Sequence, residues 1–136
     1  MTKGSCLCGE VQFEIGDNTT DIGMCHCSKC RKVSGTASNA TLMVSSDGLR
    51  WISGEDSLLK YANADGWGAW RCAVCGSPTP RLHGGGGAYW VPVGLLDGDP
   101  GVEVAGHIFV GSKAAWDELH GKKPQYEAGF ESKKLK

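Results

Sequence analysis

Apolar and polar residues alternate with a period of two near the start of the chain. Val11, Phe13 and Ile15 are separated by the polar residues Gln12 and Glu14. This spacing places the apolar side chains on one face of an extended backbone, so it predicts a strand with one buried face. The same reasoning predicts further short strands at the stretch ending in Met24-Cys25 and at residues 41–44, 49–53, 58–62, 67–71, 79–82, 88–95 and 107–110.

Turn-forming residues separate these segments. Asn63-Ala64-Asp65-Gly66 lies between residues 58–62 and 67–71, which predicts a hairpin that ends just before Cys72. The chain holds 21 glycines among its 136 residues, and we find no internal repeat. Many short strands in a chain of this length predict a mainly β fold in a single domain, residues 1–136.

Two stretches favour helix. Residues 28–32 can form one helical turn with Ser28 as its N-cap and Gly35 at its end. Residues 112–119 predict one short C-terminal helix, capped by Ser112 and stopped near Gly121.

Seven cysteines fall into three groups. Three of them lie within six residues, in Cys25-His26-Cys27-Ser28-Lys29-Cys30. The others form two pairs, Cys6-Leu7-Cys8 and Cys72-Ala73-Val74-Cys75, each followed by a glycine that permits a tight turn. The two pairs together supply the four ligands of a closed structural zinc site, and the remaining three thiols leave one zinc position open, as catalytic sites do.

Composition and charge exclude several classes of protein. The odd, clustered set of cysteines favours metal binding in a reducing compartment over a disulfide framework. No apolar run has the length of a membrane span or a signal peptide, so we expect a soluble, cytoplasmic protein that does not bind membranes. The net charge of −1 lacks the basic excess expected of a nucleic-acid binder.

Five motifs, which include all seven cysteines, stand out along the chain. They are Gly4-Ser5-Cys6-Leu7-Cys8-Gly9, Cys25-His26-Cys27-Ser28-Lys29-Cys30-Arg31, Trp51-Ile52-Ser53-Gly54-Glu55, Cys72-Ala73-Val74-Cys75-Gly76-Ser77, and His107-Ile108-Phe109-Val110-Gly111-Ser112-Lys113 with Trp116. Together, over about residues 4–127, they resemble the glutathione-dependent formaldehyde-activating (Gfa-like) family.

The resemblance implies a β-tent fold with two zinc ions per chain. It implies a structural zinc on Cys6, Cys8, Cys72 and Cys75. It implies a catalytic zinc on Cys25, Cys27 and Cys30. The implied activity is that of an S-(hydroxymethyl)glutathione synthase or carbon–sulfur lyase, which joins formaldehyde to the thiol of glutathione. No segment of the chain is identified as a glutathione site.

The donor set gives a separate reason to expect a thiol substrate. Three thiolates donate electron density to zinc and weaken its Lewis acidity, so ionisation of a bound water is disfavoured relative to an all-histidine site. A fourth sulfur suits such a soft site, and a metal-bound thiol is deprotonated. The resulting thiolate can attack an electrophilic carbon such as that of formaldehyde.

We considered three alternatives to a zinc enzyme that acts on a thiol. A zinc deaminase is disfavoured because no proline precedes Cys27 and because Glu10 lies at the start of a strand. The cysteine spacing matches neither familiar ferredoxin pattern, which disfavours an iron–sulfur cluster. The third alternative is a non-catalytic β-tent module in which both zincs are structural and the surface binds a protein.

Several residues beside the cysteines have simple structural interpretations. We expect His26 to be an exposed loop residue and His107 to be a hydrogen-bonded structural histidine. Arg31, with its neighbours Lys29 and Lys32, is either a stabiliser of thiolates and a partner for a substrate carboxylate or part of a solvated basic turn. The tryptophans are expected to build the core and cover the zinc sites. They are Trp51, Trp67, Trp70, Trp90 and Trp116.

Overall fold

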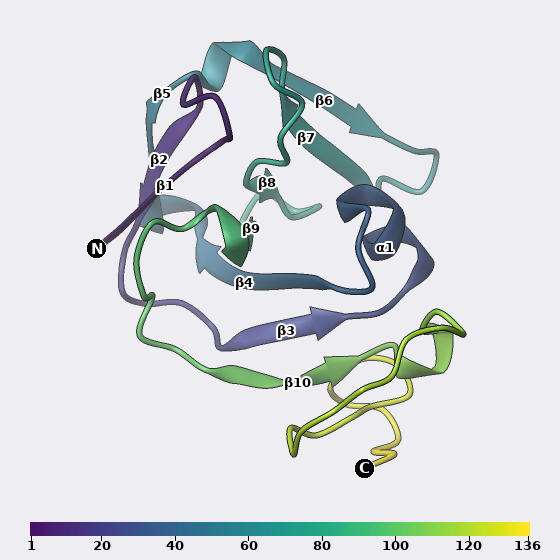
Figure 1. The fold of residues 1–136 in the computed structure, drawn as a ribbon. Helices are drawn as coiled ribbons and strands as arrows, with labels where there is room; N and C mark the ends of the chain where they lie inside the picture. Colours follow the sequence, from purple (N-terminus) through teal and green to yellow (C-terminus); the bar gives the residue numbers. More distant parts are fainter. The chain divides into compact units, whose positions relative to one another are not determined.

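The structure is a computed structural model that describes residues Met1 to Lys136, and it confirms a mainly β protein (Figure 1). It contains three sheets and one short α-helix. The chain forms two compact units, which we describe separately. Unit 1 comprises Met1–Thr20 and Leu42–Val102, and unit 2 comprises Asp21–Thr41 and Glu103–Lys136. The expectation of a single domain stays a prediction.

Unit 1 begins with a three-stranded antiparallel sheet. Its strands are β1 (Thr2–Ser5), β2 (Gln12–Ile15) and β5 (Leu49–Ser53), in the order β1-β2-β5. The alternation that predicted β2 is confirmed, because Val11, Phe13 and Ile15 are at most 1% exposed. The buried face of β2 therefore forms a large part of the core of this unit.

The predicted hairpin is also present in unit 1. Strand β6 (Leu58–Ala62) pairs antiparallel with β7 (Gly68–Cys72), and Leu58 lies opposite Cys72. The Asn63 side chain accepts a hydrogen bond of 2.9 Å from the amide of Trp67, which closes the turn. A second, shorter hairpin joins β8 (Arg81–Leu82) to β9 (Ala88–Pro92). The first hairpin carries the chain directly to Cys72, as the sequence predicted.

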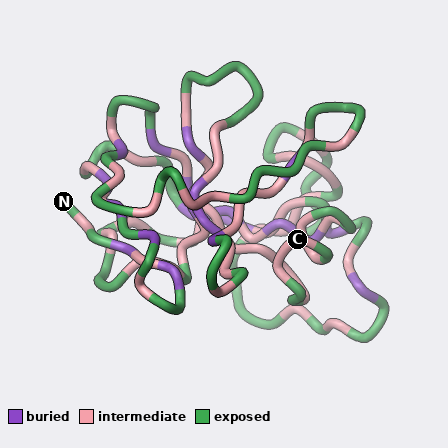
Figure 2. Tube along the Cα trace, turned by 90° about the horizontal axis from the view of Figure 1, so that it is seen from above, coloured by how far each residue is buried: buried purple, intermediate pink, exposed green.

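Three short 3₁₀ turns complete unit 1. They are η1 (Ser46–Gly48), η2 (Glu55–Ser57) and η3 (Val93–Leu95). In a tube coloured by burial, buried residues form short stretches and the loop tips are exposed (Figure 2). This is the pattern expected of short strands with one face on a core.

Unit 2 contains a parallel strand pair. Strand β10 (Val104–Ile108) lies parallel to β3 (Ile22–Cys25), with Ile108 opposite Cys25. Strand β4 (Asn39–Ser45) crosses the boundary between the units, and its first half pairs antiparallel with β3. These pairings fix the backbone on both sides of Cys25.

The single α-helix follows β3. Helix α1 spans Ser28–Ser34, and Gly35 ends it with a positive φ of 67°. The predicted helical turn and its end at Gly35 are confirmed. The predicted cap is wrong, because Cys27 and not Ser28 is the N-cap residue.

The predicted C-terminal helix at residues 112–119 is absent. The chain instead forms a 3₁₀ turn, η4 (Val110–Ser112), and a turn in which the Asp117 amide donates to the carbonyl of Ala114. An eight-residue helix is marginal without tertiary support. One tertiary contact of this segment is that of Asp117 with a buried histidine, His26, whereas Trp116, which could have anchored a helix to the core, is 72% exposed.

The tryptophans differ in their roles. Trp51 packs against the buried cluster of Cys6, Val11 and Cys72, which confirms its expected place beside the cysteines. Its indole Nε1–H donates to the Tyr89 hydroxyl at 3.2 Å. The expectation is wrong for the exposed Trp116. No helix in the structure has both the length and the hydropathy needed to cross a bilayer.

Candidate metal centres

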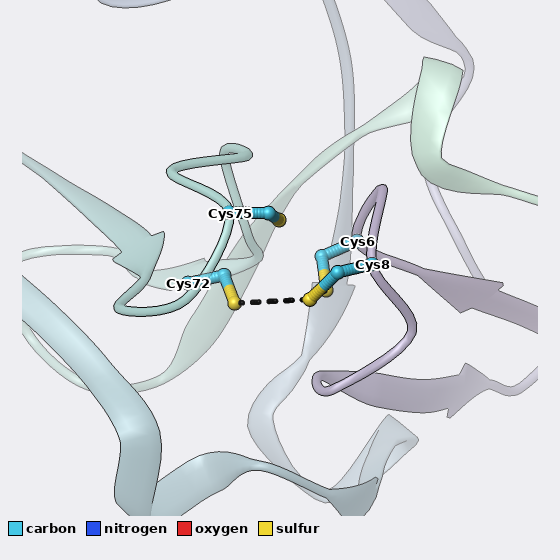
Figure 3. Close-up of side chains that lie close together, drawn as sticks. All are labelled: Cys6, Cys8, Cys72 and Cys75. Atoms are coloured by element: carbon cyan, nitrogen blue, oxygen red, sulfur yellow. Dashed lines mark hydrogen bonds between the residues drawn. The ribbon is translucent and has the colours of Figure 1, made fainter.

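The first candidate metal centre lies in unit 1 and unites the two cysteine pairs. The Sγ atoms of Cys6, Cys8, Cys72 and Cys75 all lie within 4.8 Å of one another, and their side chains converge (Figure 3). Cys8 Sγ is 3.7 Å from Cys6 Sγ and 3.8 Å from Cys72 Sγ. A tetrahedron of Zn–S bonds of about 2.3 Å requires sulfurs about 3.8 Å apart. The spacing therefore fits zinc.

Two tight turns present these sulfurs. Gly9 and Gly76 have φ values of 82° and 76°, which confirms the predicted need for glycine after each pair. Within the turns, the amide of Val11 donates to Cys6 Sγ at 3.2 Å and the amide of Val74 donates to Cys72 Sγ at 3.4 Å. Amide donors stabilise sulfur in its thiolate form, which is the form that binds metal.

Hydrogen bonds shift the pKa values of these thiols in opposite directions. Those from the Ser77 backbone and from the Cys8 backbone lower the pKa of Cys75 to about 6. Burial raises the pKa of Cys6, but hydrogen bonds from the Val11 amide and from the Cys8 and Cys72 thiols outweigh it, and the net shift is downward. A backbone hydrogen bond lowers the pKa of Cys8, but desolvation and the sharing of its proton with the neighbouring sulfurs outweigh it and raise the pKa to about 12. The four sulfurs cannot all ionise readily until a divalent cation neutralises their charge.

The second candidate centre lies in unit 2 and has three sulfurs. The Sγ atoms of Cys25, Cys27 and Cys30 lie within 4.8 Å of one another. Each sulfur comes from a different part of the local fold: the end of β3, the N-cap of α1, and the first turn of α1. Cys27 Sγ accepts a hydrogen bond of 3.3 Å from the Cys30 amide. The helix therefore begins on one thiol and brings another beside it.

The thiols of this group are strongly coupled. The hydrogen bond from Cys30 lowers the pKa of Cys25 to about 6, against the opposing effect of burial. The same contact raises the pKa of Cys30, because its proton is shared with the neighbouring thiolate. Without a cation the three sulfurs cannot all ionise readily, so this set also has the chemistry of a metal site.

His26, between two of these cysteines, is not the exposed loop residue that we expected. It is 1% exposed, and its Nε2 lies 2.9 Å from Nδ1 of His107. The expectation that His107 is a hydrogen-bonded histidine is confirmed. Burial is the main reason that the pKa values of both histidines are lowered from 6.5, which favours neutral rings at neutral pH.

Asp117 was missed by the sequence analysis. Its Oδ2 lies 3.5 Å from Nδ1 of His26, and its side chain is only 15% exposed. The Lys113 ammonium donates to the Asp117 backbone carbonyl at 2.9 Å, which fixes the turn that carries the carboxylate. The sequence analysis expected Asp117 to lie on a helix over residues 112–119 and so gave it no partner. The signal that could have found it is the burial of His26, because a buried histidine needs a polar partner.

Arg31 contacts backbone near the second group. Its Nε donates to the carbonyl of His26 at 3.3 Å, and its other contact is a 3.4 Å hydrogen bond from an NH2 group to the carbonyl of Ser112. The guanidinium therefore braces the cysteine loop against the turn after β10. Arg31 thus has a structural role, and its two predicted alternatives, a partner for thiolates and a substrate or part of a solvated basic turn, stay predictions.

Comparison with known families decides the classification of the chain. Residues 1–112 match the family described as "Glutathione-dependent formaldehyde-activating enzyme". The chain belongs to this family. All seven cysteines lie within the matched segment. No curated protein matches the chain.

A solved structure is also similar to this Gfa family protein. It is the crystal structure of a Rhodobacter sphaeroides protein, which matches this chain with a TM-score of 0.61 and 28% sequence identity. The match covers 71% of this chain and 89% of the other. The likeness supports the fold described above.

Proposed function

We propose that this protein is a zinc-dependent carbon–sulfur lyase of the Gfa type, which binds a thiol, with glutathione as the leading candidate, and adds it to formaldehyde or a related electrophile. The observation that carries the proposal is the difference between the two sulfur groups. One group offers four sulfurs and the other offers three. A three-sulfur site leaves one coordination position for a substrate.

The cysteines have different roles in this proposal. Cys6, Cys8, Cys72 and Cys75 would hold a structural zinc that ties together segments 64 residues apart. Cys25, Cys27 and Cys30 would hold the catalytic zinc. A zinc ion on three thiolates supplies a soft position that keeps a fourth sulfur deprotonated.

The reaction needs little from the protein beyond this position. The glutathione thiol would release its proton to solvent, and the resulting thiolate would attack the carbonyl carbon of formaldehyde and form the carbon–sulfur bond. The carbonyl π pair moves to oxygen, and the oxygen takes a proton from solvent to give S-(hydroxymethyl)glutathione. The reverse reaction is the lyase direction. The loop would contribute by holding the Sγ atoms of Cys25, Cys27 and Cys30 together as thiolates, whose negative charge keeps the bound substrate sulfur nucleophilic.

Exchange spectroscopy tests the substrate pair. Glutathione and formaldehyde combine without a catalyst, so only acceleration above that background counts. NMR exchange between free and hydroxymethylated glutathione should be faster with catalytic amounts of the zinc-loaded protein. Equal exchange rates with and without protein would exclude this substrate pair while leaving other thiols open.

One observation favours the alternative of a non-catalytic zinc-stabilised β-tent binding module. Leu7 and Val74, at the tips of the two cysteine turns in unit 1, are 89% and 70% exposed. Exposed apolar side chains can mark a protein-binding surface. In that case both zincs are structural and added thiols leave the second one unchanged.

Metal retention should differ between the two centres. Freshly prepared protein should carry up to two zinc ions, and a mild chelator should remove about one equivalent while the far-UV circular dichroism is retained. The reason is that three protein ligands hold an ion less securely than four. Simultaneous loss of both ions with collapse of the fold would show that neither site is open.

A further inference from the structure

A buried chain of three polar side chains lies beside the three-cysteine loop in unit 2. His26 Nε2 is 2.9 Å from His107 Nδ1, and His26 Nδ1 is 3.5 Å from Asp117 Oδ2. Both His26 Nδ1 and Asp117 Oδ2 are inaccessible to solvent, and neither makes a hydrogen bond in this structure, although they face one another. A buried polar atom without a partner costs free energy, so these two atoms are each other's natural partners.

The donors and acceptors in this chain can be assigned. A carboxylate oxygen only accepts, so the proton of the His26 ring belongs on Nδ1, facing Asp117. His26 Nε2 then accepts from the Nδ1–H of His107. This arrangement uses one proton on each neutral ring and leaves no conflict between donors. The order is therefore Asp117, His26, His107.

The position of His26 connects these three side chains to the cysteine loop. Its neighbours on both sides, Cys25 and Cys27, are the proposed ligands, so a rotation of the His26 backbone would move both sulfurs. The His26 amide donates to the Ile108 carbonyl at 3.0 Å, and its carbonyl accepts from Arg31. Backbone and side chain thus hold the same residue from both sides.

We propose that Asp117 is a positioning residue for the three-cysteine centre: through the contact of its carboxylate with the His26 ring it holds the Cys25–Cys30 loop in the shape that binds the metal. The inference rests on the proposed function for the metal itself, but the shape of the loop can be measured without it. Substitution of a residue that orients metal ligands without binding the metal typically lowers metal affinity by about 10- to 100-fold.

Two nearly isosteric substitutions separate the polar contact between Asp117 and His26 from packing. Asp117→Asn keeps an oxygen that can accept from His26, whereas Asp117→Leu fills a similar volume with no acceptor. Glu118→Leu is the matched control, because this neighbouring carboxylate is 84% exposed and contacts only the exposed His120 among the ion pairs of the chain. Asp117→Ala replaces the leucine variant if that variant does not fold.

Two measurements on the full-length protein test the proposal. The first is the dissociation constant of cobalt(II) at the second centre, from its thiolate-to-cobalt absorption in competition with a chelator. The second is hydrogen exchange of the Cys30 and Arg31 amides in protein that carries zinc only at the four-cysteine centre. Asp117→Leu should weaken cobalt binding by about tenfold or more and speed exchange of these amides by a similar factor. Asp117→Asn should restore both values to within about threefold of the unchanged protein.

The outcomes distinguish this proposal from the proposed function. Wild-type affinity and loop exchange in Asp117→Leu would overturn the positioning role and leave the lyase proposal intact. Equal defects in Asp117→Asn and Asp117→Leu would also overturn it, because an oxygen acceptor facing His26 would then not be what holds the loop. If the unchanged protein bound only one metal ion, the proposed function would fail, and the exchange measurement would still decide whether Asp117 shapes the loop.

Discussion

Replacing Cys72 with serine should yield aggregated or unfolded protein. Cys72 is 1% exposed and forms a buried cluster with Cys6 and Val11, against which Trp51 and Leu58 pack. Loss of one of the four proposed ligands would release the proposed structural zinc, which would otherwise link Cys8 to Cys72, 64 residues apart. A crosslink that closes a loop of this length stabilises a fold by about 4 kcal/mol on the disulfide-type estimate.

That loss is a large share of the stability of a small domain, which is typically about 5 to 15 kcal/mol. It adds to the cost of three thiols left crowded together without a cation. Solubility on expression, zinc content and thermal melting measure the effect. A soluble Cys72→Ser protein with a melting temperature close to that of the unchanged protein would show that the four-cysteine centre does not support the fold.

Replacing Cys27 with serine should leave a folded protein with one zinc and no turnover above background. Cys27 is partly exposed and closes only the short loop from Cys25 to Cys30, so losing its metal releases less chain entropy. Serine is also a favoured N-cap residue, so helix α1 should keep its start. The expected defect is therefore confined to the second centre.

Comparison of the two variants decides how the centres divide their roles. Both replace one sulfur by one oxygen, so each is the matched control for the other. Zinc content, melting temperature and accelerated exchange of hydroxymethylated glutathione should be measured on both. A Cys27→Ser protein that unfolds as severely as Cys72→Ser would show that the three-cysteine loop is structural, and the binding-module alternative would then lead.

Much of unit 1 was predictable because its signals are local. Alternation at Val11, Phe13 and Ile15 specified a strand, and the turn at Asn63 to Gly66 specified a hairpin that ends at Cys72. Local spacing showed the two cysteine pairs and the group of three, and the need for four ligands joined the two pairs, which lie 64 residues apart. The strands, the hairpin and the pairs depend on short-range geometry, which a sequence displays directly.

The contacts around His26 could not be predicted in the same way. Its partners, His107 and Asp117, are 81 and 91 residues further along the chain, and neither carries a local signal that points to His26. The capping and apolar pattern at residues 112–119 favoured a helix, whereas the segment forms turns and is contacted from far along the chain, by His26 at Asp117 and by Arg31 at the Ser112 carbonyl. Tertiary contacts overrode a weak local preference, which is the common fate of short helical segments.

Titration of cobalt-substituted protein with glutathione tests the central claim, that the three-cysteine centre keeps a position for a thiol. The first centre should stay saturated with zinc, and cobalt should occupy only the second. Added glutathione should increase the thiolate-to-cobalt absorption in a saturable way, because a fourth sulfur joins the cobalt, whereas S-methylglutathione should leave it unchanged. A spectrum that is unchanged by glutathione while cobalt remains bound would contradict the account.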